Sequence, residues 1–203
     1  PANKALAYNK DISYSILELD SKKIIIAEKL VNSVVESCSL GKFKILKSFK
    51  GDEFKNTLCS HPFKNLGYNF DVPMFEANFV TLEQGTGIVH CAPSHGPDDF
   101  NLCLKHGIKA VETVNNDGRY TKNIPVFEGT HVFKADEIII KNLQEQKNLL
   151  GSGTLVHSYP HSWRSKAPLV HRATSQWFIS METKDLRKKA LKAIDDTDFY
   201  PER

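Results

Sequence analysis

The apolar residues of this chain occur in short runs separated by polar turns, and this pattern restricts the folds available to it. Near the start, apolar and β-branched residues fill three segments, 5–8, 14–19 and 22–27. Polar turns at 9–11 and 20–21 separate them. Short runs of this kind, bounded by turn residues, are typical of β-strands. The segment therefore predicts three consecutive strands arranged as a meander.

Three later segments have helical periodicity instead. Apolar residues recur at helical spacing over 28–37 before Gly41, over 135–149 before Gly151, and over 184–194. Glycine just past the last periodic residue is a common helix stop. We therefore expect three amphipathic helices at these places.

Residues 43–49 alternate apolar and basic side chains, which predicts a strand with one basic face. The lysines are Lys42, Lys44, Lys47 and Lys50. Such a run either lies against solvent or follows the phosphates of a nucleic acid, and the sequence leaves both alternatives open.

Further strands are expected in 68–82, where Pro73 interrupts the pattern, and in the short apolar run before His90. Many short strands with few helices, in no regular βαβ alternation, predict an α+β fold that is mainly β, with a closed or strongly curved sheet. The longest apolar runs have only a handful of residues, far fewer than the roughly 20 of a membrane span, so no membrane partner is expected.

Charge and cysteine content add little. The net charge of +3 is compatible with a nucleic-acid partner but does not require one. The four cysteines include no CxxC pair, so reduced thiols and a cytoplasmic location are expected. The first residue is not Met and the last residues follow a polar run, so we expect a piece of a longer chain.

The most informative stretch is GTGIVHCAPSHGPDDF, residues 85–100. Its glycines allow close approach of the backbone to a ligand, a short apolar strand ends at His90, and Pro97 suits the first position of a helix. Asp98 and Asp99 then fall in the first helical turn, where a carboxylate can hold a cationic group of a ligand. An ordinary acidic first turn is the structural alternative.

Other chemistries fit this stretch poorly. His90 and Cys91 are adjacent, so they point to opposite faces of a strand and form neither a close ligand pair nor a nucleophilic dyad. No metal site is therefore expected. GTG is not followed by GK[ST] or GxGxxG, so neither common phosphate-binding loop is present.

Residues 85–100 are similar to the signature of the editing domain, connective peptide 1, of the isoleucyl-tRNA synthetase family. Three motifs occur in the order expected of that family. PAN at 1–3 resembles the end of the segment that enters the domain, and HSYPHSWR at 157–164 with QWFI at 176–179 resembles the return toward the catalytic core. The valyl and leucyl relatives share the GTG, the proline and the last aspartate, but usually lack a histidine at the position of His90 and the HSYPHSWR return.

The resemblance implies a β-barrel editing domain decorated with helices at residues 1–156. Residues 157–203 would be a return segment toward the catalytic core, ending in a helix. It also implies hydrolysis of the ester that links valine to the 3′-terminal adenosine of tRNA(Ile), together with clearance of valyl-adenylate. The partners would be the acceptor end of tRNA(Ile) and valyl-adenylate or valyl-adenosine. No cofactor would serve this part of the chain, whereas the parent ligase would use ATP and magnesium and would be a monomer.

The same resemblance assigns roles to single residues. Asp99 would bind the α-ammonium of the misattached valine, and His90 would line the side-chain pocket and exclude isoleucine by its bulk. The backbone contacts to the terminal adenosine would come from the residues of the GTG strand: Gly85, Thr86, Gly87, Val89, Cys91 and Ala92. Asp98 would be a helix-cap or surface residue, and water would be the nucleophile.

One feature of the family leaves an alternative open. The threonines that line the same pocket in the family would precede Pro1. The alternative reading is therefore a module that binds the acceptor end of tRNA but is inactive without the parent enzyme.

Overall fold

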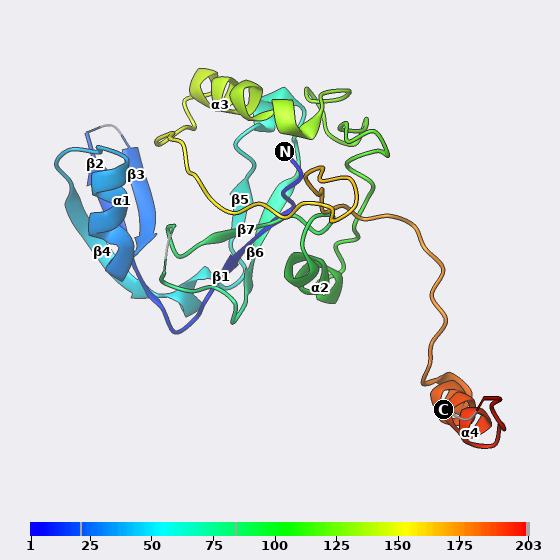
Figure 1. Ribbon diagram of the computed structural model, residues 1–203. Helices are drawn as coiled ribbons and strands as arrows, with labels where there is room; N and C mark the ends of the chain where they lie inside the picture. The colour runs from blue at the N-terminus through cyan, green and yellow to red at the C-terminus, as the bar shows by residue number, and fades with distance from the viewer. Residues whose placement is uncertain (21, 84, 202–203) are drawn as a thin grey trace. The chain divides into compact units, whose positions relative to one another are not determined.

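The computed structural model describes residues 1–20, 22–83 and 85–201, which divide into two compact units, Pro1–Ala173 and Thr174–Arg203. The first unit contains all of the strands assigned in these residues (Figure 1). The boundary expected between residues 156 and 157 separates regions of different function. The division into compact units does not test it, so it stays a prediction.

A four-stranded sheet forms the middle of the first unit, with the order β5-β6-β1-β7. Its strands are β1 (Ala5–Tyr8), β5 (Leu58–Ser60), β6 (Asp71–Glu76) and β7 (Val89–Cys91). Strand β1 lies parallel to β6 and antiparallel to β7. The predicted meander is therefore wrong for β1, because its hydrogen-bonding partners come from segments more than 60 residues away in sequence rather than from its neighbour in the chain.

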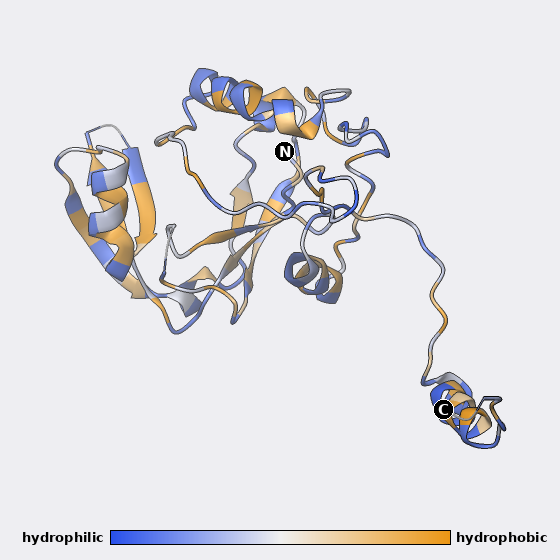
Figure 2. Ribbon diagram, in the orientation of Figure 1, coloured by the Kyte–Doolittle hydropathy of each residue, from blue (hydrophilic) through white to orange (hydrophobic). Residues whose placement is uncertain are grey.

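A three-stranded antiparallel sheet is built from β2 (Ser13–Leu19), β3 (Lys22–Ala27) and β4 (Lys44–Lys50), in the order β3-β2-β4. Here the predicted strand positions and the β2–β3 hairpin are confirmed. Strand β3 is hydrophilic at its first residues and hydrophobic over the rest (Figure 2), and its last two residues, Ile26 and Ala27, are buried.

Helix α1 (Val31–Ser37) follows a 3-10 turn at Glu28–Leu30, so the predicted helix over 28–37 is confirmed with a 3-10 first turn. Its buried Val31 and Val34 pack into the same cluster as Leu17 and Ile26 of the three-stranded sheet. Burial of these side chains fixes the helix against the sheet, because an isolated helix of this length is marginal in water.

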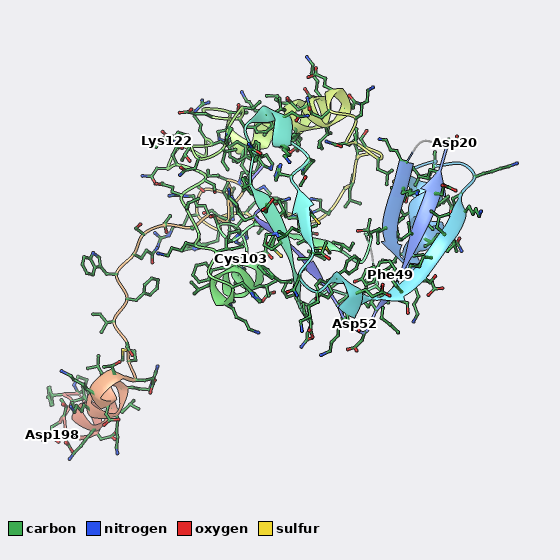
Figure 3. All side chains as sticks on the ribbon, turned by 180° about the vertical axis from the view of Figure 1, so that it is seen from behind. Asp20, Phe49, Asp52, Cys103, Lys122 and Asp198 are labelled. Atoms are coloured by element: carbon green, nitrogen blue, oxygen red, sulfur yellow. The ribbon has the colours of Figure 1, made fainter. Side chains whose placement is uncertain are left out.

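The two sheets share one hydrophobic core, in which Tyr8 and Met74 of the first sheet meet Tyr14 and Leu17 of the second. Figure 3 shows Phe49 near the end of β4, where its ring stacks on Tyr14 with centroids 6.1 Å apart. The mixed α and β architecture is therefore confirmed. Backbone hydrogen bonds within the described ranges give two open sheets and no closed barrel.

The rest of the first unit packs around the four-stranded sheet. Helix α2 (Pro97–Lys105) packs beside β7 through Cys103, and helix α3 (Asp136–Glu145) packs with a second core around Phe63, Tyr68 and Phe127. Short 3-10 turns lie at Gly51–Phe54, Lys64–Leu66 and Val132–Lys134.

The predicted helix over 135–149 ends earlier than expected, because Lys147 adopts a left-handed conformation (φ 57°). The amide of Asn148 then donates to the carbonyl of Leu143, which caps the helix before Gly151 is reached.

The second unit holds a 3-10 turn at Thr183–Asp185 followed by helix α4 (Leu186–Asp195), which confirms the predicted helix over 184–194. In the described part of the chain, none of the helices combines the length and the hydropathy needed to cross a membrane.

Candidate functional site

The loop of residues 85–88, here called the GTG loop, leads into β7 and is held by the three-stranded sheet. The hydroxyl of buried Tyr14 donates to the carbonyl of Gly87 over 2.7 Å, and the amide of Ala27 donates to the carbonyl of Thr86 over 2.8 Å. Both partners are more than 55 residues away in sequence. The backbone of this loop is therefore fixed in place by long-range contacts.

Both the backbone conformation and the packing at position 87 require glycine. Its φ is +76°, a conformation that glycine adopts easily and other residues rarely do. A Cβ at this position would also collide with the Cβ of Ala27. Gly85 has the same φ of +76°, but an added Cβ there would meet none of the described atoms within 4 Å.

Strand β7 separates its side chains between two faces, as alternation requires. Cys91 is fully buried against Ala5, Ala7 and Cys103, on the face that α2 covers. His90 is exposed and points to the other face, where it pairs across the ladder with Leu6. Of these two side chains, only that of His90 is exposed.

A tight turn at residues 92–96, here called the site turn, connects β7 to α2. The amide of His95 donates to the carbonyl of Ala92 over 2.9 Å, and the amide of Phe100 donates to that of Gly96 over 2.9 Å as the helix begins. Gly96 is the N-cap and Pro97 is the first helical residue. The predicted order of strand, loop and helix is confirmed.

Asp99 lies in the first turn of α2 and reaches back to the end of β7. Its Oδ2 accepts a hydrogen bond of 2.9 Å from the amide of Ala92. No other hydrogen bond to this half-buried carboxylate is present among the residues that the structure describes. The positive end of the helix dipole favours the negative charge held there.

The thiols of Cys91 and Cys103, which lie near Asp99, are poor nucleophiles. Burial, and secondarily the charge of Asp99, raises the pKa of Cys91 to about 12 and raises that of Cys103 as well. Figure 3 labels Cys103 on α2. Both thiols are therefore protonated near neutral pH.

The structure brings some of the predicted site residues together and leaves others open. Asp99 contacts Ala92, and Thr86 and Gly87 are anchored to the three-stranded sheet. That His90 and Asp99 reach one ligand stays a prediction. Asp98 is exposed and lines a groove of about 930 Å³ between α2 and β6.

Sequence reasoning missed the residues that hold the site in place. Tyr14 and Ala27 carry no local signal for this role, because they act on residues 73 and 59 positions further along the chain. His95 and Thr113 were missed for the same reason, although their side chains are joined by a hydrogen bond of 2.7 Å. In the described ranges, His, Cys, Asp and Glu side chains form no group of three that could hold a metal ion.

Comparison with known families defines the class of this fold and site. The profile of the family described as leucyl-tRNA synthetase, editing domain, matches residues 5–151, which include both sheets, the GTG loop and α2. The chain belongs to this family of synthetase editing domains.

Curated relatives narrow the resemblance to isoleucine enzymes. The isoleucine–tRNA ligase of Pelagibacter ubique (strain HTCC1062) is 68% identical over 209 residues, covering 100% of this chain and 23% of that protein. That of Gluconobacter oxydans (strain 621H) is 44% identical over 225 residues, with the same shares covered. The chain thus spans about a quarter of the length of these relatives. The predicted resemblance to an isoleucyl-tRNA synthetase editing domain is confirmed.

A solved structure supports the fold independently of close sequence similarity. The crystal structure of GlLeuRS-CP1 matches 78% of this chain and 79% of its own, with a TM-score of 0.56 at 13% sequence identity. At that identity the match concerns the fold alone.

Proposed function

We propose that this chain hydrolyses the ester between valine and the 3′-terminal adenosine of tRNA(Ile), and also helps to clear valyl-adenylate. The observation that carries the proposal is the carboxylate of Asp99, whose Oδ2 is held by the Ala92 amide and whose Oδ1 makes no hydrogen bond to the described residues, in a chain of the editing-domain family. A carboxylate held in this way suits an α-ammonium group.

The GTG loop would hold the adenosine. Its backbone is fixed by Tyr14 and Ala27, so it can offer amide and carbonyl groups to a nucleoside without reorganising. Val89, Cys91 and Ala92 would extend this backbone surface along β7. The resemblance to the family assigns these contacts, and the rigidity of the loop supports them.

His90 would form one wall of the valine side-chain pocket and exclude isoleucine by its volume. Editing is needed because one methylene in an apolar pocket is worth only about 1–3 kcal/mol, a limit for which isoleucyl-tRNA synthetase is itself a standard example. A second site that admits valine and rejects isoleucine removes the errors that remain.

The nucleophile would be water. It adds to the ester carbonyl, the C–O bond to the ribose breaks, and the ribose oxygen leaves with a proton, which releases free valine and intact tRNA. The protonated, buried thiol of Cys91 is unsuited to attack, which supports water in that role. Positioning of the water and a ribose hydroxyl would supply the activation.

The test compares two neighbouring carboxylates. Asp99→Asn keeps an oxygen that can accept from Ala92 but removes the negative charge, so it should weaken binding of a non-hydrolysable amide analogue of valyl-adenosine by about tenfold to a hundredfold. Asp98→Asn, one residue earlier and exposed, should leave the affinity unchanged. Equal affinities for the wild type and Asp99→Asn would contradict the proposed site.

The properties of the parent protein are part of the same proposal. It would be a monomeric, cytoplasmic ligase that joins isoleucine to tRNA with ATP and magnesium. The barrel expected of the editing domain also stays a prediction. It is supported by the shared core of the two sheets and by the Ala27–Thr86 hydrogen bond between the end of β3 and the loop before β7.

A further inference from the structure

The site turn is clamped from two sides by segments that are remote in sequence. On one side, the Ser94 hydroxyl donates to the Val111 carbonyl over 2.6 Å, and Thr113 Oγ1 meets His95 Nε2 over 2.7 Å. On the other side, the amide of Ala173 donates to the Ser94 carbonyl over 2.8 Å. These contacts make the turn a junction between residues 111–113 and 171–173.

The His95 ring contacts both of these segments, through Thr113 and through His171. Its Nδ1 lies 2.8 Å from the carbonyl oxygen of His171. Because a carbonyl can only accept, Nδ1 carries the hydrogen. In the neutral ring Nε2 then has a lone pair, which accepts from the hydroxyl of Thr113. The Thr113 side is buried, so the hydroxyl has few other partners.

Arg172 holds residues 171–173 from outside the turn. Its guanidinium donates to Asn116 Oδ1 over 2.6 Å and to the Val114 carbonyl over 3.4 Å, and it lies 3.8 Å from the carboxylate of Glu112. The segment is thus held against 112–116, while His95 connects it to the site turn.

We propose that His95 is a positioning residue for Asp99. Through Thr113 and His171 it fixes the site turn, and the site turn fixes the Ala92 amide that holds the Asp99 carboxylate. The inference rests on the proposed function and extends it, because it makes the ammonium contact depend on residues 171–173, which directly precede the second unit.

The site turn connects His95 covalently to both ends of the Ala92–Asp99 hydrogen bond. Ala92 and His95 are joined by the turn hydrogen bond, and Gly96 begins the helix that carries Asp99. A shift of the His95 ring therefore moves both ends of the Ala92–Asp99 hydrogen bond. Loss of either ring contact should relax the turn without disturbing the GTG loop, which is anchored separately on Tyr14 and Ala27.

The test uses the full chain and two ligands: the amide analogue of valyl-adenosine, and the same amide without its α-amino group. Thr113→Val leaves Nε2 without its donor, so it should weaken binding of the first ligand by about three- to tenfold and leave the second unchanged. Thr113→Ser retains the hydroxyl and should restore the affinity. His95→Asn retains only the contact with His171 and should match Thr113→Val, with no further loss in the double variant.

A second variant separates the effect of residues 171–173 from local damage to the turn. Arg172→Ala should lower the hydrogen-exchange protection of the Ala92 and Phe100 amides. Arg119→Ala is the matched control, because Arg119 also binds a carbonyl, that of Gly129, away from the turn. It should leave both amides protected.

The outcomes are distinguishable. Equal weakening of both ligands by Thr113→Val, or no weakening of either, would overturn the positioning role if Asp99→Asn still discriminates between them. Unchanged protection of Ala92 in Arg172→Ala would overturn the dependence on residues 171–173. If Asp99→Asn itself fails to discriminate, the proposed role of Asp99 falls, and the inference falls with it.

Discussion

Substitution of Gly87 by alanine should damage the GTG loop for two separable reasons. The left-handed backbone (φ +76°) costs a residue with a Cβ about 1–2 kcal/mol. The new Cβ also collides with that of Ala27, and such overpacking costs about 1–3 kcal/mol. Together these predict a loss of about 2–5 kcal/mol in the free energy of unfolding.

Gly85→Ala is the matched control for this prediction. Gly85 has the same φ, but its added Cβ meets none of the described atoms, so only the backbone cost of about 1–2 kcal/mol applies. The difference between the two variants measures the packing cost. Adding Ala27→Gly to Gly87→Ala removes the collision and should recover that difference, minus the cost of a glycine at the end of β3.

Urea unfolding followed by circular dichroism measures these free energies for the wild type, Gly85→Ala, Gly87→Ala and the double variant. The Gly87→Ala chain should also bind the valyl-adenosine analogue less tightly, because its loop can no longer keep the contacts with Tyr14 and Ala27. Equal destabilisation by Gly85→Ala and Gly87→Ala, or no recovery in the double variant, would refute the close contact with Ala27.

Two further predictions concern histidines. His90→Ala should enlarge the valine pocket, so the parent enzyme should begin to hydrolyse correctly made isoleucyl-tRNA; slower valine release with isoleucine still protected would instead indicate a general base. Burial lowers the pKa of His61 to about 4, so the unfolded chain binds a proton below about pH 6.5 that the folded chain refuses. The free energy of unfolding should therefore fall by about 2 kcal/mol between about pH 7 and pH 5. His61→Phe should remove this contribution in urea titrations and leave that of the Pro1 amino group, whose pKa burial lowers to about 6; an unchanged slope would contradict the role of His61.

Local elements could be predicted from the sequence because their signals are local. Alternating or periodic apolar residues located β2, β3, α1 and α4, and Pro97 marked the start of α2. Strand β6 was harder, since Pro73 was expected to interrupt it. The strand continues because Pro73 precedes the three residues that pair with β1, where its missing N–H removes no bond of that ladder.

The tertiary contacts could not be predicted in the same way. The pairing of β1 with β6 and β7, and the anchoring of Gly87 by Tyr14, join segments whose separation leaves no periodic trace. In the candidate site, too, the local features were predictable and the long-range contacts were not. Asp99 could be placed at a helix start, but its hydrogen bond to Ala92 and the clamp by His95 depend on how the turn folds.

The proposed hydrolytic activity is tested most directly by measuring deacylation by this chain of tRNA(Ile) carrying valine or isoleucine, with Asp99→Asn measured alongside. We expect release of valine well above the uncatalysed rate, little release of isoleucine, and loss of the valine reaction in Asp99→Asn. Binding of both charged tRNAs without release of either amino acid would contradict a hydrolytic site in this chain and would indicate a binding module that depends on the rest of the enzyme.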